Sequence, residues 1–318
     1  MRLTSGQSPD NGRSKIRGAA LVAILWVIAI LSIAVFSATQ FLFVGVESES
    51  NADASFRAET LAERGIALAA HPQMERGDPV LVQILNERES FEARISSEGA
   101  RLNLNTLLAN HERDRIVLEE LFYQWGMRRD EAVDLVDNLV DWVDEDDLPT
   151  SIGAERGYYL SVDRPNHPFN RAFVYLEEAL LVKDFATLTR LNPDWMDSFT
   201  LLSQGPLDLN EAPPELVSVA CQCSFEAARL FVQTRNGLDG LDGTEDDLRF
   251  RETEEAMALL GLPGDGSDAV LGRVSISDSV QRLISVGRYG TVSVESSVTL
   301  TAKNESGKIL QWGTHRIE

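Results

Sequence analysis

Aspartates recur at spacings of three and four along one predicted helix, and an acidic run follows that helix directly. Carboxylates so spaced share one helix face and repel one another, unless water screens them or a cation gathers them. Calcium takes roughly six to eight oxygen ligands, typically from carboxylates and carbonyls. A solvated acidic face and a calcium site are both open readings of this pattern. The best candidate ligands are Asp141, Asp144, Asp146 and Glu155.

A second acidic segment, residues 236–247, alternates aspartate with glycine in the sequence NGLDGLDGTEDD. Its oxygen-rich side chains suit calcium, although their spacing does not match the EF-hand loop. A solvated acidic loop is the competing interpretation. The candidate calcium ligands here are Asp239, Asp242, Asp246 and Asp247.

Catalytic patterns find little support in the sequence. Its four histidines are scattered, and neither a Gly-x-Ser-x-Gly elbow nor a phosphate-binding glycine loop occurs. The formal net charge is −21, from 29 basic and 50 acidic residues, which opposes binding to nucleic acid phosphates. We therefore expect a protein that is neither an enzyme nor a nucleic-acid binder, with a membrane-tethered hydrolase as a distant alternative.

Residues 19–46 contain no charged side chain, and this run exceeds the roughly 20 apolar residues that span a bilayer. Arg13, Lys15 and Arg17 precede it, and Glu47 is the first charge after it. The positive-inside rule places the first residues in the cytoplasm and the rest of the chain outside. The sequence thus predicts a single-pass membrane protein with its C-terminal part outside the cytoplasm.

The junction Lys15-Ile16-Arg17-Gly18-Ala19 resembles a prepilin leader, which is cut on the cytoplasmic side after the glycine. The resemblance implies processing between Gly18 and Ala19 by prepilin peptidase, with a methylated new N-terminus. Most pilins carry glutamate at the fifth mature position, whereas this chain has Ala23 there. An uncleaved membrane anchor is the alternative that these features alone leave open.

The helix that begins in the apolar run is expected to continue to about residue 70, because Pro72 limits it. Small residues between Ala54 and Ala69 recur at spacings of three and four, forming a stripe that allows close packing. The stripe is expected to contact either the globular part of the same chain or neighbouring helices.

Alternating apolar residues predict strands over Arg282–Arg288, 292–301 and Lys308–Thr314 near the C-terminus. Glu89–Ile95 and Arg101–Asn105 flank Glu98-Gly99 and read as another hairpin. Between these strands, amphipathic periodicity predicts helices, among them His111–Trp125, Arg129–Val143 and Phe225–Arg235.

We therefore predict an α+β protein, in which a long N-terminal transmembrane helix packs on an antiparallel β-sheet and a mostly helical block lies between the strands. The expected organisation is a leader (1–18), a membrane and assembly helix (19–70), a first pilin-like part (71–105), an inserted domain of helix-hairpin-helix or SAM-like type (106–268) and a C-terminal sheet (269–318).

Several motifs together resemble one family, type II secretion system protein K. They are Arg17-Gly18 with the apolar run, ERGIALAA, EGARLNLNTL, the stretch from DNLVDWVDEDD to GAERGYY, and LDLNEAPPELV. The resemblance covers the chain from about Arg17 to its end. It implies a pilin-like fold with a large inserted α-helical domain, anchored in the inner membrane with its C-terminal part in the periplasm. It also implies a minor pseudopilin at the tip of the periplasmic pseudopilus, which supports the export of folded proteins.

The same resemblance implies calcium binding and a complex with minor pseudopilins I and J, in contact with the major pseudopilin. The secretin and the secreted proteins are further candidate partners. A minor pilin of a type IV pilus, serving adhesion, motility or DNA uptake, is the alternative function.

Overall fold

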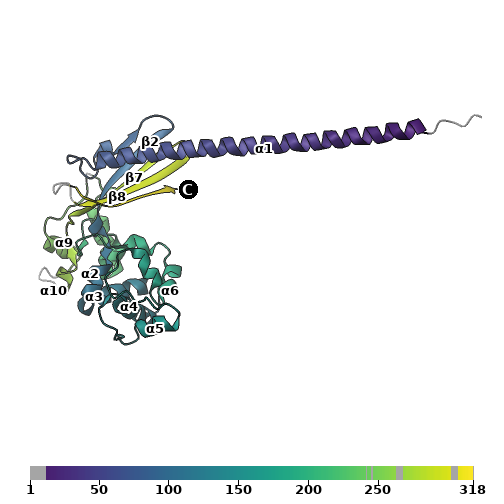
Figure 1. Cartoon of the computed structure of the whole chain (residues 1–318). Coiled ribbons are helices and arrows are strands. Elements are labelled where there is room, and N and C mark those ends of the chain that lie inside the picture. The colour runs from purple at the N-terminus through teal and green to yellow at the C-terminus, as the bar shows by residue number, and fades with distance from the viewer. Residues whose placement is uncertain (1–11, 241, 245, 263–267, 302–306, 318) are drawn as a thin grey trace, which may run out of the picture. The chain divides into compact units, whose positions relative to one another are not determined.

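The computed structural model of the chain describes residues 12–240, 242–244, 246–262, 268–301 and 307–317 (Figure 1). The side chains of residues 12–21, 38 and 40–50 lie outside this description. Residues up to Arg57 form one compact unit, and residues from Ala58 onward form a second. Each unit is described by itself.

Helix α1 (Gly12–Ala69) supplies all of the described structure of the first unit and enters the second. Its apolar side chains between Val22 and Phe36 are exposed; Trp26 and Ile33 each expose 66% of their surface. Among the described residues, no helix combines the length and the apolar character that crossing a membrane requires. The side chains of residues 19–21, 38 and 40–46 in the predicted apolar run are outside the description. The predicted processing site, Gly18 and Ala19, is outside it as well. The membrane-spanning helix and the processing site stay predictions.

The second unit contains a five-stranded antiparallel sheet in the order β1-β2-β7-β8-β9 (Figure 1). Strand β2 pairs with β7 from Glu89 opposite Tyr289 to Ser97 opposite Gln281. A tight turn at Gly290, whose φ is +61°, joins β7 to β8. The strands are β1 (Val82–Ile84), β2 (Glu89–Ser97), β7 (Val280–Tyr289), β8 (Val292–Thr301) and β9 (Ile309–Ile317).

The end of α1 packs directly on this sheet, because small residues let the two backbones approach. Ala58, Ala62 and Ala69 are fully buried, and a side chain at Gly65 would overlap Ser285. The core between the helix and the sheet consists of Ile66, Ala69, Leu81, Ala93, Ile95, Leu283, Val298 and Leu300. Of the two contacts expected for the small-residue stripe, the structure has the one with the chain's own sheet.

The predicted hairpin around Glu98-Gly99 is wrong. Strand β2 pairs with β7, and Leu102–Asn103 (β3) instead pairs in parallel with Phe199–Thr200 (β4). The reason is that the 3-10 turn Glu98–Ala100 directs Glu98 inward, where its fully buried carboxylate accepts hydrogen bonds from Thr200 and Arg101. The chain therefore leaves the sheet at this turn instead of folding back along β2.

Helices dominate the segment between β2 and β7. The predicted helix Arg129–Val143 forms with those bounds, and Ser224 caps Phe225–Arg235 by accepting a hydrogen bond from Ala227 N at 3.2 Å. A further parallel strand pair joins Leu207–Asp208 (β5) to Val274–Ser275 (β6). The helices are α2 (Leu104–Ala109), α3 (His111–Gln124), α4 (Arg129–Val143), α5 (Arg156–Ser161), α6 (Phe185–Leu191), α7 (Pro214–Cys221), α8 (Phe225–Arg235), α9 (Thr253–Leu259) and α10 (Asp268–Leu271).

These helices enclose a second hydrophobic core, which includes the fully buried Trp142, Phe122 and Phe199. The predicted class, a mixture of helix and antiparallel sheet, is confirmed.

Substitution of Gly287 tests the close approach of α1 to β7. A Cβ at this position would overlap the backbone of Ala58 and Ala62, so we expect Gly287→Ala to lower the free energy of unfolding by about 1–3 kcal/mol. The control is Gly157→Ala in α5, where an added Cβ meets nothing within 4 Å. Urea unfolding of the detergent-solubilised chain, followed by circular dichroism, gives both values. Equal unfolding midpoints for the two variants would contradict the packing.

Candidate functional site

The end of helix α4 and the start of α5 bring acidic side chains together. Asp141 lies on the buried face of α4 and is 0% exposed. Asp144 is the residue at which α4 ends, and Glu155 immediately precedes α5 with only 5% of its surface exposed. The connection between the two helices therefore returns the carboxylate of Glu155 to the end of α4.

One oxygen from each of Asp141, Asp144 and Glu155 lies within 4.8 Å of the other two. Two oxygens bound to one calcium ion at about 2.4 Å can be at most about 4.8 Å apart. The three carboxylates are thus close enough to share one ion.

Several oxygens of this group are buried and have no hydrogen-bond partner of standard geometry among the described residues: Asp141 Oδ2, Asp144 Oδ1 and both carboxylate oxygens of Glu155. The remaining oxygen of Asp141 accepts a hydrogen bond from Thr150 N at 3.0 Å. Any side chain at Gly153 would overlap Asp141 Oδ2, so glycine allows the loop to close over the group. Buried anionic oxygens without partners are costly, and a bound cation would remove that cost.

Burial raises the pKa of all three carboxyl groups, because a low-dielectric environment disfavours the charged form. For Glu155, burial and then the charges of Asp141 and Asp144 raise the pKa to about 7. For Asp144, the nearby Asp146 is the next cause after burial. The electrostatics and the geometry both fit a divalent cation.

The other acidic residues of this region are satisfied in other ways. Asp137 is buried on the same helix but forms an ion pair with Arg115 at 2.8 Å. Asp146 is exposed, and its Oδ1 accepts a hydrogen bond from Leu148 N at 2.7 Å. Of the four ligands predicted here, the structure brings together Asp141, Asp144 and Glu155.

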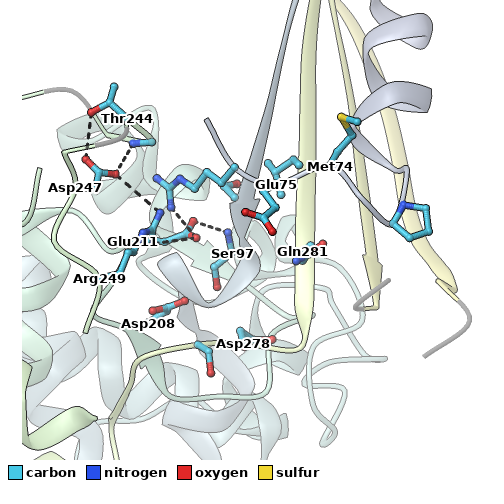
Figure 2. A pocket seen from close by; sticks show the side chains of 16 residues that line it. Met74, Glu75, Ser97, Asp208, Glu211, Thr244, Asp247, Arg249, Asp278 and Gln281 are labelled. Carbon is cyan, nitrogen blue, oxygen red and sulfur yellow. Dashed lines mark hydrogen bonds and ion pairs between the residues drawn. The ribbon is translucent and has the colours of Figure 1, made fainter. Parts of the chain in front are cut away.

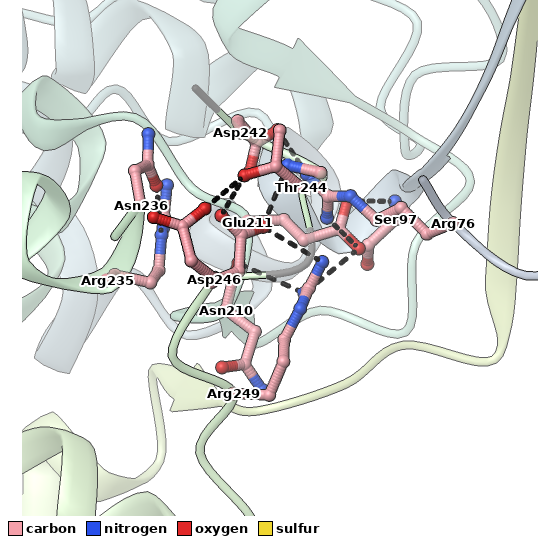
Figure 3. Close-up of polar contacts among 12 residues, drawn as sticks. Arg76, Ser97, Asn210, Glu211, Arg235, Asn236, Asp242, Thr244, Asp246 and Arg249 are labelled. Carbon is pink, nitrogen blue, oxygen red and sulfur yellow. Dashed lines mark hydrogen bonds and ion pairs between the residues drawn. The ribbon is translucent and has the colours of Figure 1, made fainter. Parts of the chain in front are cut away.

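The second acidic segment is held mainly by hydrogen bonds within its own loop. Asp247 Oδ2 accepts from Gly243 N at 2.8 Å, and Arg249 lies 4.0 Å from the same oxygen (Figure 2). Asp246 Oδ2 accepts from Leu238 N at 2.6 Å, and the Thr244 hydroxyl donates to either Asp246 or Asp239 (Figure 3). The Thr244 hydrogen bond is the largest cause that lowers the pKa of Asp246.

Asp242 forms an ion pair with Arg76, which also pairs with Glu211 at 2.6 Å (Figure 3). Within the described residues, no three carboxylates of this loop meet the spacing that one ion needs. Calcium at Asp239, Asp242, Asp246 and Asp247 stays a prediction without the convergence seen at Glu155.

Sequence reasoning missed Arg76 and Glu211. They lie far apart in the sequence, and neither belongs to a motif that indicates an ion pair. It also missed Gly153, whose role depends on the close approach of Asp141.

The chain is similar to known proteins in part of its sequence and in its fold. Residues 100–193, which are less than a third of the 318-residue chain, match the family model described as type II secretion system (T2SS), protein K. A search of curated proteins found no match.

Among solved structures, the chain resembles one from the crystal structure of the GspK-GspI-GspJ complex of the enterotoxigenic Escherichia coli type 2 secretion system. The TM-score is 0.57 and the sequence identity 16%, and the match covers 86% of this chain and 99% of the other. At this identity the likeness establishes the fold. The family model and the fold together confirm the resemblance of this chain to type II secretion system protein K that its motifs indicate.

Proposed function

We propose that this chain is a minor pseudopilin of a type II secretion system, a structural subunit and not an enzyme. The observation that carries the proposal is the match of residues 100–193 to the protein K family, within a fold that covers 99% of the similar solved chain. The family match favours this role over that of a type IV minor pilin. The solved relative assembles with GspI and GspJ, so we propose minor pseudopilins I and J as partners.

The proposed position is the tip of the pseudopilus, in support of protein export. The segment between β2 and β7 adds the helices α2 to α10 to the sheet and α1. We expect so large a segment to clash with neighbouring subunits if it is packed on both sides in a filament. A subunit at the tip has free space above it. Ala23 agrees with this position, because a buried carboxylate there would need a partner amine.

We further propose that the N-terminal helix anchors the mature chain in the inner membrane, with the second unit in the periplasm. The exposed apolar side chains from Val22 to Phe36 support this, because a surface of that kind is normally covered by lipid or protein. Charge asymmetry around the apolar run supports the orientation. The major pseudopilin and prepilin peptidase are then expected contacts during assembly and processing.

The cation in the proposal is calcium, held by Asp141, Asp144 and Glu155. When bound, it would neutralise the three carboxylates and tie the start of α5 to the end of α4. The remaining coordination positions of calcium would be filled by carbonyl oxygens or water.

Immunoprecipitation of the tagged chain from membranes of its own host tests the function. We expect minor pseudopilins I and J to co-purify in near-equal amounts, and the N-terminal peptide to begin at methylated Ala19. Deleting the gene should abolish secretion of the system's substrates. Loss of secretion with neither partner recovered would contradict the tip complex, whereas an intact Met1-bearing chain would contradict processing at Gly18.

Calcium should stabilise the folded protein, because the ion binds the folded state and not the unfolded chain. At 100 times its dissociation constant a ligand adds about 2.7 kcal/mol, which corresponds to a rise in Tm of roughly 5–10 °C for a protein of this size. Glu155→Gln and Asp144→Asn should remove most of this rise, measured by calorimetry with calcium or chelator.

Two further variants serve as comparisons. Asp134→Asn changes a carboxylate of the same helix that lies outside the convergent group, and it should keep the full response. Asp242→Asn tests the second acidic segment. If Asp242→Asn abolished the calcium response while Glu155→Gln left it intact, the ion would have to be placed in the second segment.

The stability of the calcium-free protein should fall as the pH rises from about 4.5 to about 7. In that range the folded state keeps the proton on Glu155, whose pKa is raised to about 7, while the unfolded chain has released it. Calcium competes with this proton, so the calcium-induced rise in Tm should be small at pH 5.5 and full at pH 8. Glu155→Gln should flatten the pH dependence of the calcium-free protein. A calcium effect of equal size at both pH values would argue against Glu155 as a ligand.

A further inference from the structure

A cavity of about 610 Å³ lies within the second unit, where the segment after α1 and the end of β2 meet the helical segment (Figure 2). It is separate from the acidic group at Glu155, and none of its lining residues belongs to that group. Five carboxylates and two guanidinium groups line it: Glu75, Asp208, Glu211, Asp247, Asp278, Arg76 and Arg249.

The two arginines of the cavity already have partners. Arg76 pairs with Glu211 and with Asp242, and Arg249 lies 3.7 Å from Glu211 and 4.0 Å from Asp247. The other three lining carboxylates, Glu75, Asp208 and Asp278, form no ion pair with any described residue. The cavity therefore keeps an excess of negative charge.

Asp208 and Asp278 are the two of these carboxylates that backbone N–H groups hold in place. Asp208 is 2% exposed, and its Oδ1 accepts a hydrogen bond from Asn210 N at 3.0 Å. Asp278 accepts from Val280 N at 2.6 Å and from Gln204 N at 2.8 Å. Backbone N–H groups donate to both carboxylates, and neither carboxylate forms an ion pair with a described residue. Burial raises the pKa of each, and at Asp208 it outweighs the opposing effect of the Arg249 charge.

Neutral oxygens in the cavity wall also lack donors. Ser97 is only 9% exposed, and its hydroxyl accepts no hydrogen bond of standard geometry, although it interacts with the carboxylate of Asp208 and lowers the pKa of that group. Gln281 Oε1 is likewise buried without a partner. In Figure 2 the Ser97 oxygen points toward the side of the cavity where Asp208 and Asp278 lie. Buried oxygens normally have hydrogen-bond donors, and this wall leaves two of them, Ser97 Oγ and Gln281 Oε1, without one of standard geometry.

A single metal ion does not fit this arrangement. Among the described residues, three carboxylates converge within 4.8 Å at Asp141, Asp144 and Glu155 but not in this cavity. The volume also far exceeds that of one ion. The separated acceptors instead suit a cationic group that carries several N–H donors.

The lining also has an apolar part, formed by Pro72, Met74 and Ile95. Lysine and arginine side chains have an aliphatic stem and a charged end, so they match a pocket with apolar and acidic sides. Arg76 provides an internal example, because this cavity wall already holds its guanidinium between carboxylates.

We propose that this cavity binds a lysine or arginine side chain of another polypeptide, with the stem along Met74 and Ile95 and the charged end among Asp208, Asp278, Ser97 and Gln281. The net charge of −21 would draw such a basic segment to the protein. The proposal stands independently of the secretion role, because it rests on the cavity alone.

Titration of the full-length, detergent-solubilised chain with short capped peptides tests the proposal. Acetyl-Gly-Arg-Gly-amide and its lysine counterpart should bind, whereas the citrulline peptide, which is similar in shape but neutral, should bind at least about tenfold more weakly. Asp208→Asn and Asp278→Asn should each weaken binding of the arginine peptide by about tenfold or more. Asp194→Asn, an exposed aspartate outside the cavity, should leave binding unchanged.

Gln281→Met removes an acceptor without changing charge and should weaken binding severalfold, so the test remains available if an aspartate variant misfolds. Spermidine is a further arm, since it carries ammonium groups without a peptide. Equal binding of the citrulline and arginine peptides, an unchanged affinity in all three cavity variants, or binding of spermidine but of neither basic peptide would each overturn the proposal.

Discussion

β2 and β7 are neighbours in the sheet although most of the chain's second unit lies between them in sequence. Their pairing closes residues 98–279 into a loop whose two ends lie side by side. The entropy cost of closing a loop grows only slowly with its length, so a large helical segment can be carried between adjacent strands. The contact also places one face of β7 against α1, which buries that face of the sheet through Gly65 and Gly287.

Local patterns predicted the elements whose stability is local. Sequence patterns predicted the helices Arg129–Val143 and Phe225–Arg235 with the observed bounds, because one face of each packs on the core. The hairpin at Glu98-Gly99 failed because a turn signal is short-range. The burial of Glu98 against Thr200 and the pairing of β2 with β7 involve residues about a hundred or more positions away.

Short-range sequence patterns also could not predict which acidic residues form a site. Spacing placed Asp137 and Asp141 on one face of α4, and the structure buries both. Only the fold shows that Arg115 neutralises Asp137 while Asp141 is left with Asp144 and Glu155. Helix periodicity gives the direction of a side chain, but it does not reveal which counter-charge another element brings. For the same reason the ion pairs of Arg76 with Glu211 and Asp242 could not be predicted from the sequence.

The two acidic segments have similar composition but different surroundings, and the surroundings decide what each can do. The loop of residues 236–247 turns its backbone N–H groups and Thr244 toward its own carboxylates, so those charges are stabilised without an ion. At the end of α4 the carboxylates lie close together and are largely buried, and several of their oxygens have no described donor in standard hydrogen-bond geometry. Repulsion among the carboxylates of Asp141, Asp144 and Glu155 disfavours the loop conformation that brings Glu155 back to the end of α4. A cation would turn that repulsion into a link between α4 and α5, so the packing of these two helices would depend on the concentration of the ion.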